Sequence, residues 1–152
     1  VSYEGELAVI IKTITKGVKA ADAAECIYGY TIANDVTARD WQRTDGQWAR
    51  AKGSDTFCPI GPWINTHWSI EEAEHLGIET RVNDEVRQSG QTSQMVRGIA
   101  ELVSYVSGFT TLLPGDLILT GTPAGVGAMA DGDTVEVSID GLGTLSNRVV
   151  GE

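Results

Sequence analysis

Short segments with alternating apolar and polar residues, joined by tight-turn sequences, recur along this chain and limit the folds that it can adopt. Two of them flank Asn83-Asp84, a pair that favours a two-residue hairpin turn. Thr134–Ile139 alternates in the same way, and Asp140-Gly141 then turns the chain into a closing strand. This pattern predicts a fold rich in antiparallel β-sheet.

One long amphipathic helix is predicted over Gln94–Gly108, with Ser93 placed to cap its start and Gly108 to end it. The apolar residues that repeat at helical spacing are Met95, Ile99, Leu102, Val103 and Val106. We interpret this stripe as core. The expected fold class is therefore α+β, with β-rich, mostly antiparallel sheets and one long helix packed on them.

A chain of 152 residues forms one domain with a core of its own, so residues 1–152 are expected to be a single domain.

Composition argues against several kinds of partner. A formal net charge of −10 is unsuited to nucleic acid or to an anionic membrane surface. No apolar run approaches the roughly 18 residues of a membrane span. Cys26 and Cys58 stand alone, which indicates neither a zinc site nor a disulfide framework and fits a reducing, cytoplasmic location. The chain opens inside a core-like strand and without Met, so we expect a fragment or processed chain that lacks its N-terminal part.

A strand followed by a helical turn is predicted over Gly29–Gln42. Asp35 ends the strand, and Thr37 is placed to cap the turn that follows. Arg39 and Gln42 would share one side of that turn, because residues three apart lie on one helix face. This arrangement suits a cation held beside an anionic ligand, and it equally suits an ordinary surface Asp–Arg pair.

Glu4 and Glu6 lie in the first predicted strand and point to the same face, because side chains alternate along a strand. Two carboxylates only about 6–7 Å apart repel each other, and burial strengthens the repulsion. Mg²⁺ or Mn²⁺ would remove it, since both ions favour carboxylate oxygens and water. The alternative is a solvated edge strand that carries two surface acids.

Other polar residues are open to two readings. Lys52 lies in a semi-apolar setting before a glycine, where it either binds a carboxylate or enolate or is simply solvated. His67 and His75 are the only histidines, and His75 belongs to an acidic run that is most simply a solvated helical turn.

A glycine-rich segment, Gly121–Gly127, follows a short strand. It lacks the Gly-Lys-Ser/Thr of a P-loop. Gly125-x-Gly127-x-x-Ala130 matches the spacing of a dinucleotide fingerprint but runs into a turn where that motif needs a helix, so we reject a nucleotide site. The segment instead allows close approach of the backbone to a ligand, with Thr122 as a hydroxyl donor.

Taken together and in order, these segments resemble the fumarylacetoacetate hydrolase family over nearly the whole chain. The segments that carry the resemblance are Glu4-Gly5-Glu6, the run 34–40, Arg50-Ala51-Lys52-Gly53 with the later Pro59-x-Gly-Pro, and Leu113-Pro114-Gly115-Asp116 leading to Gly121-Thr122-Pro123. The resemblance implies the β-roll-like fold of that family's catalytic domain and a homodimer.

The resemblance also implies a role for each candidate residue. Glu4, Glu6 and Asp35 would hold Mg²⁺ or Mn²⁺, with water in the remaining positions. The other implied roles are substrate carboxylate and oxygen contacts for Arg39 and Gln42, the cation beside the reacting centre for Lys52, and a second carboxylate anchor for Thr122.

The function that the resemblance implies is cleavage of a C–C bond in a small 2-oxo or 2,4-dioxo acid, by hydrolysis or decarboxylation through a metal-bound enolate. One alternative is an isomerase of the 2-hydroxyhepta-2,4-diene-1,7-dioate type in aromatic catabolism. Another is a metal-stabilised non-catalytic domain or an inactive fragment. Hydrolases of the family use a His–Glu pair upstream of this region, and His67 and His75 do not match it.

Overall fold

The computed structural model describes residues 1–151, and its strands form two four-stranded sheets and one two-stranded ribbon. The first sheet has the order β4-β3-β2-β7, the second the order β10-β9-β5-β6, and β1 pairs with β8. The strands of the first sheet are β2 (Gly5–Ile11), β3 (Ile27–Asn34), β4 (Ile60–Asn65) and β7 (Leu117–Leu119). Those of the second sheet are β5 (Gly77–Val82), β6 (Glu85–Gln91), β9 (Thr134–Ile139) and β10 (Gly143–Arg148), and the ribbon is β1 (Ser2–Tyr3) with β8 (Gly127–Ala128).

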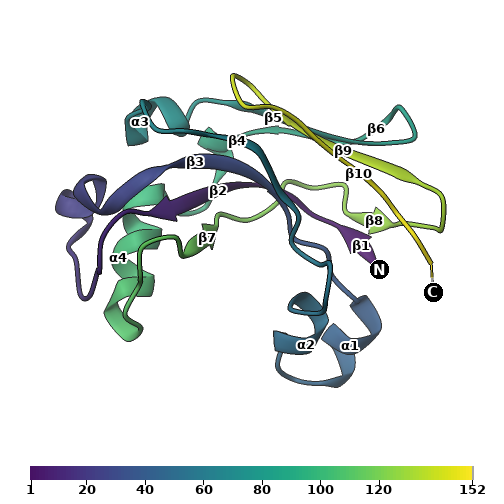
Figure 1. Ribbon diagram of the computed structural model, residues 1–152, viewed down its shortest axis with the longest axis horizontal. Helices are drawn as coiled ribbons and strands as arrows, with labels where there is room; N and C mark the ends of the chain where they lie inside the picture. The colour runs from purple at the N-terminus through teal and green to yellow at the C-terminus, as the bar shows by residue number, and fades with distance from the viewer. Residues whose placement is uncertain (152) are drawn as a thin grey trace.

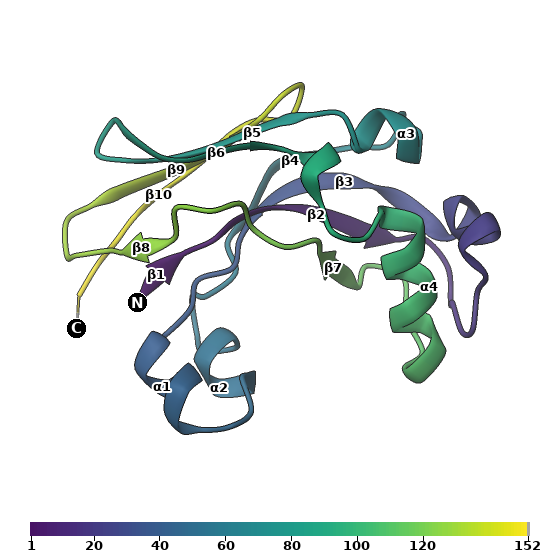
Figure 2. The ribbon, with the colours of Figure 1, turned by 180° about the vertical axis from the view of Figure 1, so that it is seen from behind.

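Every strand pair within residues 1–151 is antiparallel, which confirms the predicted sheet type. The β5–β6 hairpin turns at Asn83-Asp84, where both residues have positive φ, 51° and 67°. These are the backbone angles that favour Asn and Asp in a two-residue hairpin. The two larger sheets lie one over the other in Figures 1 and 2.

The helices are short apart from one. They are α1 (Arg39–Thr44), α2 (Ala49–Lys52), α3 (Ile70–Ala73) and α4 (Ile99–Phe109), with two 3-10 turns, η1 (Ala20–Cys26) and η2 (Thr92–Gln94). The longest, α4, packs against η1 at one end of the sheets, while α1 and α2 form a small unit that projects from the first sheet (Figure 1). No helix in the described residues is long and apolar enough to cross a membrane.

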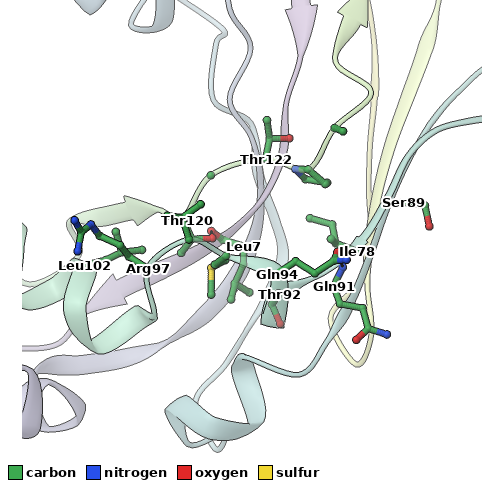
Figure 3. A pocket seen from close by; sticks show the side chains of 15 residues that line it. Leu7, Ile78, Ser89, Gln91, Thr92, Gln94, Arg97, Leu102, Thr120 and Thr122 are labelled. Carbon is green, nitrogen blue, oxygen red and sulfur yellow. Dashed lines mark hydrogen bonds between the residues drawn. The ribbon is translucent and has the colours of Figure 1, made fainter.

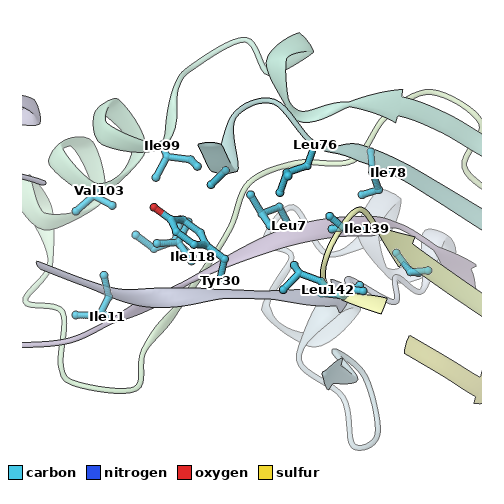
Figure 4. Packing of buried hydrophobic residues seen from close by; sticks show 14 of the residues in the cluster. Leu7, Ile11, Tyr30, Leu76, Ile78, Ile99, Val103, Ile118, Ile139 and Leu142 are labelled. Atoms are coloured by element: carbon cyan, nitrogen blue, oxygen red, sulfur yellow. The ribbon is translucent and has the colours of Figure 1, made fainter. Parts of the chain in front are cut away.

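The hydrophobic core lies between the two sheets and extends to α4 (Figure 4). It contains Leu7, Val9, Ile11, Tyr30, Ile32, Ile78, Ile99, Val103, Val137 and Ile139. Because β2 is buried along its whole length, its second face is also closed to solvent. Glu6, which points to that second face, is therefore a buried carboxylate.

The long helix begins later than its apolar pattern predicts. It starts at Ile99 rather than Gln94, with Gly98 as its N-cap residue. The Ile99 N–H donates to Oε1 of Glu74 at 2.6 Å, so a side chain distant in sequence fixes the start. Met95 lies outside the helix yet still packs on the core, and Gly108 lies within the last turn.

The first predicted strand also differs from the structure. The first strand is interrupted at Glu4, because Ser2 and Tyr3 pair with β8 while β2 pairs with β3. The alanine-rich segment after Lys19 forms the 3-10 turn η1, and β3 begins at Ile27.

Candidate metal centre

Three acidic side chains converge where β2 and β3 meet. The β2–β3 register pairs Gly5 with Asn34, so the end of β3 lies beside the start of β2, and the Asp35 N–H donates to the Glu4 carbonyl at 2.8 Å. One carboxylate oxygen from each of Glu4, Glu6 and Asp35 lies within 4.8 Å of the others. Glu4 and Glu6 are 8% and 3% exposed, and the Asp35 side chain is 13% exposed. We call these three residues the carboxylate cluster.

Two cations contact the cluster. The Lys52 ammonium donates to Asp35 Oδ2 at 2.6 Å and to Glu4 Oε2 and Thr37 Oγ1 at 3.0 Å each. Arg39 forms an ion pair with Glu4 Oε1. Burial by itself would lower the pKa of Lys52, but its hydrogen bonds to Asp35 and Glu4 outweigh burial and leave the pKa above its ordinary value. Lys52 is therefore a cation at neutral pH.

Glu6 has no such partner among the described residues. Its carboxylate accepts one hydrogen bond, from the Gly121 N–H at 2.5 Å. The pKa of Glu6 is raised to about 7, chiefly by burial and also by the negative charges of Asp35 and Glu4, against the lowering effect of that hydrogen bond. Negative charge is thus incompletely neutralised on the Glu6 side of the cluster.

These residues fit a hard divalent cation. Mg²⁺ and Mn²⁺ favour carboxylate oxygens, and a bound dication would stabilise the ionised form of Glu6 that burial disfavours. Cys58 is not a member of this cluster, and hard cations prefer oxygen ligands to a thiol. Glu4, Glu6 and Asp35 are therefore the residues that would hold the ion.

The turn after β3 differs from its prediction. Thr37 does not cap α1; its hydroxyl donates to the Asp35 carbonyl at 2.9 Å and accepts from Lys52. The N-cap residue of α1 is Ala38, without a side-chain cap. Arg39 and Gln42 share one side of the helix as expected, since Arg39 donates to Gln42 Oε1 at 2.9 Å.

Thr122 lies in the loop 121–125, one residue from the Gly121 N–H that contacts Glu6. Its hydroxyl donates to the Gly5 carbonyl at 2.8 Å and accepts from Nε2 of Gln88 at 2.8 Å. The single hydroxyl proton is therefore already used, and Thr122 would have to turn it away from Gly5 to donate to a carboxylate. No helix follows the loop within the described residues, in agreement with the rejected dinucleotide site.

A cavity of about 560 Å³ opens on the other face of β2 (Figure 3). It is lined by Leu7 and not by any member of the carboxylate cluster, and Leu7 and Glu6 point to opposite faces of the strand. Thr122 borders the cavity. At the carboxylate cluster, Lys52 and Arg39 form ion pairs with Glu4, and this chemistry rather than the position of the cavity identifies the candidate site.

The histidines lie elsewhere. His75 contacts the Glu71 carbonyl through Nδ1 at 2.7 Å, and neither His67 nor His75 belongs to the carboxylate cluster. Gln88, which contacts Thr122, was not anticipated from the sequence. It is the buried residue of an otherwise polar and largely exposed strand, and no motif marks it.

Together, the fold and the cluster define a β-rich α+β domain with a candidate divalent-metal centre. The chain belongs to the fumarylacetoacetate hydrolase family, because the family model described as fumarylacetoacetate (FAA) hydrolase C-terminal matches residues 1–150. Among curated relatives, protein Rv2993c of Mycobacterium tuberculosis is 56% identical over 99% of this chain and 57% of its own length. The oxaloacetate tautomerase YisK of Bacillus subtilis is 46% identical over 97% of this chain and 51% of its own length.

Solved structures confirm the fold. The 5-carboxymethyl-2-hydroxymuconate delta-isomerase from Mycobacterium smegmatis has a TM-score of 0.95 and 55% identity, covering 99% of this chain and 60% of that one. A fumarylpyruvate hydrolase from Pseudomonas aeruginosa, in complex with Mn²⁺ and pyruvate, has a TM-score of 0.92 and 40% identity, covering 99% and 66%. The chain thus spans about half to two thirds of the length of these relatives, whose names include a tautomerase, an isomerase and a hydrolase.

Proposed function

We propose that this domain carries the metal centre of an enzyme that acts on a small 2-oxo or 2,4-dioxo acid, with Glu4, Glu6 and Asp35 as ligands of Mg²⁺ or Mn²⁺. The observation that carries the proposal is the convergence of three buried carboxylates with Lys52 and Arg39. The Mn²⁺ and pyruvate complex of the Pseudomonas hydrolase supports both the ion and the substrate class.

The bound ion would supply a Lewis acid that polarises the keto group of the substrate. Arg39 would bind the substrate carboxylate, since a planar guanidinium matches a carboxylate in two parallel hydrogen bonds. Gln42 orients the guanidinium by accepting from it. Lys52 would stabilise negative charge that develops on the keto oxygen, because its raised pKa keeps it protonated and so unsuited to act as a base.

Each of the candidate reactions places negative charge on the keto oxygen of the substrate. Hydrolysis and decarboxylation do so when the C–C bond beta to the keto group breaks and its electron pair passes toward that oxygen, with release of an acid after water attack or of CO₂. Isomerisation and tautomerisation do so when a proton leaves the carbon next to the keto group and is returned to another atom of the substrate. The sequence resemblance favours cleavage as the outcome. Isomerisation is the second candidate, supported by the names of a relative 46% identical and a solved structure 55% identical. The family's homodimer also remains a proposal, which light scattering on purified protein tests.

Thermal unfolding tests the metal and the substrate class in turn. Mn²⁺ at a hundredfold excess over its Kd should raise the melting temperature by about 5–10 °C in a protein of this size. Oxalate, a stable mimic of a 2-oxo acid, should raise it further only when Mn²⁺ is present. A protein that responds to Mn²⁺ but not to oxalate or pyruvate would be a metal-stabilised domain without this activity. No response to Mn²⁺ would overturn the metal site itself.

Activity assays then separate the reactions. Oxaloacetate reports both tautomerisation, from the absorbance of the enol, and decarboxylation, from the pyruvate formed. An acylpyruvate reports hydrolytic cleavage, and a hydroxydienedioate reports isomerisation. Each assay is run with Mn²⁺ and with a chelator, and turnover that persists in the chelator would refute metal dependence.

A further inference from the structure

Gln88 is a buried polar residue that links three segments of the chain. It lies in β6 and is 1% exposed. Its Nε2 donates to Thr122 Oγ1 at 2.8 Å and to the Pro123 carbonyl at 2.7 Å, while its Oε1 accepts from the Gly5 N–H at 3.1 Å. The orientation of the amide follows from these partners, since the Gly5 N–H can only donate and the Pro123 carbonyl can only accept.

At Gly5, side-chain hydrogen bonds replace the backbone hydrogen bonds that a neighbouring strand would make with β2. On that side of β2, the neighbouring strand β7 pairs only with Ala8–Ile10, and the Thr120 N–H then reaches the Leu7 carbonyl at 3.1 Å. Beyond this point the Gly5 N–H bonds to Gln88 and the Gly5 carbonyl to Thr122. The side chains of Gln88 and Thr122 thus provide the hydrogen-bond partners of the Gly5 backbone, which lies between the two proposed ligands Glu4 and Glu6.

The loop 121–125 is pressed closely onto β6. Gly125 has φ of +106°, and a Cβ built on it would lie 2.0 Å from the Arg87 carbonyl oxygen. The Tyr3 hydroxyl also donates to the Gly125 carbonyl at 2.8 Å. The loop is therefore fixed to β6 and to the N-terminal segment on either side of the Gln88 contacts.

We propose that Gln88 is a positioning residue that holds the metal-ligand segment Glu4–Glu6 and the Thr122 loop in one arrangement. It acts through Gly5, whose backbone carries both glutamates, and through Thr122, whose hydroxyl it directs toward the Gly5 carbonyl. Loss of the Gln88 amide frees the Gly5 N–H and the Thr122 hydroxyl together. The expected effect of Gln88 on metal and substrate binding rests on the proposed function. Its hydrogen bonds to Gly5 and Thr122 do not depend on that function.

The test uses Gln88→Met, which keeps the length of the side chain and removes all three hydrogen bonds. Gln91→Met is the matched control, because it makes the same change at an exposed position of the same strand. Thr122→Val keeps the shape of the side chain and removes the hydroxyl that bonds to Gln88 and to the Gly5 carbonyl. The double variant with both substitutions completes a double-mutant cycle. Mn²⁺ affinity and the oxalate affinity of the Mn²⁺-loaded protein are measured by calorimetry.

We expect Gln88→Met and Thr122→Val each to weaken Mn²⁺ or oxalate binding by about 10-fold, in line with other residues that orient metal ligands. The double variant should be no weaker than the worse single variant, because both changes break the same link. A merely structural role would lower the melting temperature and leave both affinities within about twofold of the parent. That result, or fully additive effects in the double variant, would overturn the proposal.

Amide hydrogen exchange in the metal-free protein reads the linkage independently of any ligand. The Gly5 and Gly121 N–H groups should exchange at least about 10-fold faster in Gln88→Met than in Gln91→Met. If the parent binds neither Mn²⁺ nor oxalate, the proposed function fails, and the positioning role of Gln88 is then tested by amide hydrogen exchange alone. Unchanged exchange of the Gly5 N–H in Gln88→Met would overturn that role. If Gln88→Met does not fold, Thr122→Val tests the same link by the same exchange measurement at Gly121.

Discussion

The raised pKa of Glu6 predicts that the metal-free protein loses stability as the pH rises toward 7. In the folded protein the pKa is about 7, against 4.5 for the free side chain, because burial and the nearby Asp35 and Glu4 charges disfavour the anion. This difference corresponds to about 3 kcal/mol of unfolding free energy. The stabilising contribution is fully present below pH 4.5 and is lost as the pH rises through about 7, since the folded state binds this proton more tightly than the unfolded chain.

Urea unfolding with a chelator, followed by tryptophan fluorescence between pH 5 and 8, measures this effect. We expect the unfolding free energy to fall by up to about 3 kcal/mol across the range for the parent protein, and to change little for Glu6→Gln. Glu101→Gln is the control, because it removes a carboxylate at an exposed position of α4 and should keep the parent's pH dependence. Asp45, Glu72 and Asp133 have lowered pKa values, so they titrate below the range.

Mn²⁺ should reverse the trend, because the ion binds only the ionised carboxylate. Calorimetry at pH 6 in buffers of different ionisation enthalpy should therefore show release of close to one proton for each ion bound. A parent protein whose stability is the same at pH 5 and pH 8, or a Glu6→Gln variant with the parent's slope, would refute the reasoning. So would Mn²⁺ binding at pH 6 without proton release.

Three further predictions concern single residues. Asp35→Ala should weaken Mn²⁺ binding by about 100-fold or more, measured by calorimetry, and unchanged affinity would show that Asp35 is not a ligand. Lys52→Ala should keep Mn²⁺ bound while turnover of the 2-oxo acid falls by about 100-fold or more; a fall in proportion to lost metal would instead make Lys52 structural. Gly125→Ala should cost about 3 kcal/mol or more in urea unfolding, because its Cβ would lie 2.0 Å from the Arg87 carbonyl. Gly17→Ala, also at positive φ but with open space around it, should cost only about 1–2 kcal/mol, and equal costs would rule out the close contact as the cause.

The sequence predicted the features that depend on neighbouring residues. The Asn83-Asp84 pair predicts its hairpin because the turn needs only the backbone angles that these two residues tolerate. Glu4 and Glu6 could be placed on one face because the strand period is a local property, even though the chain is interrupted at Glu4. Short motifs in a fixed order along the chain also indicated the fumarylacetoacetate hydrolase family, and the family model that matches residues 1–150 confirms it.

Tertiary structure decided the features that depend on groups distant in sequence. The side chain of Glu74 fixes where α4 begins, and no pattern around Ile99 indicates it. The pKa of Glu6 follows from burial beneath other segments. Lys52 contacts Glu4 across 48 positions, and Gln88 contacts Gly5 across 83. Charge and hydrogen bonding act through space. The carboxylates, Lys52 and Arg39 could therefore be named from the sequence, whereas their contacts with one another and the involvement of Gln88 became visible only in the folded chain.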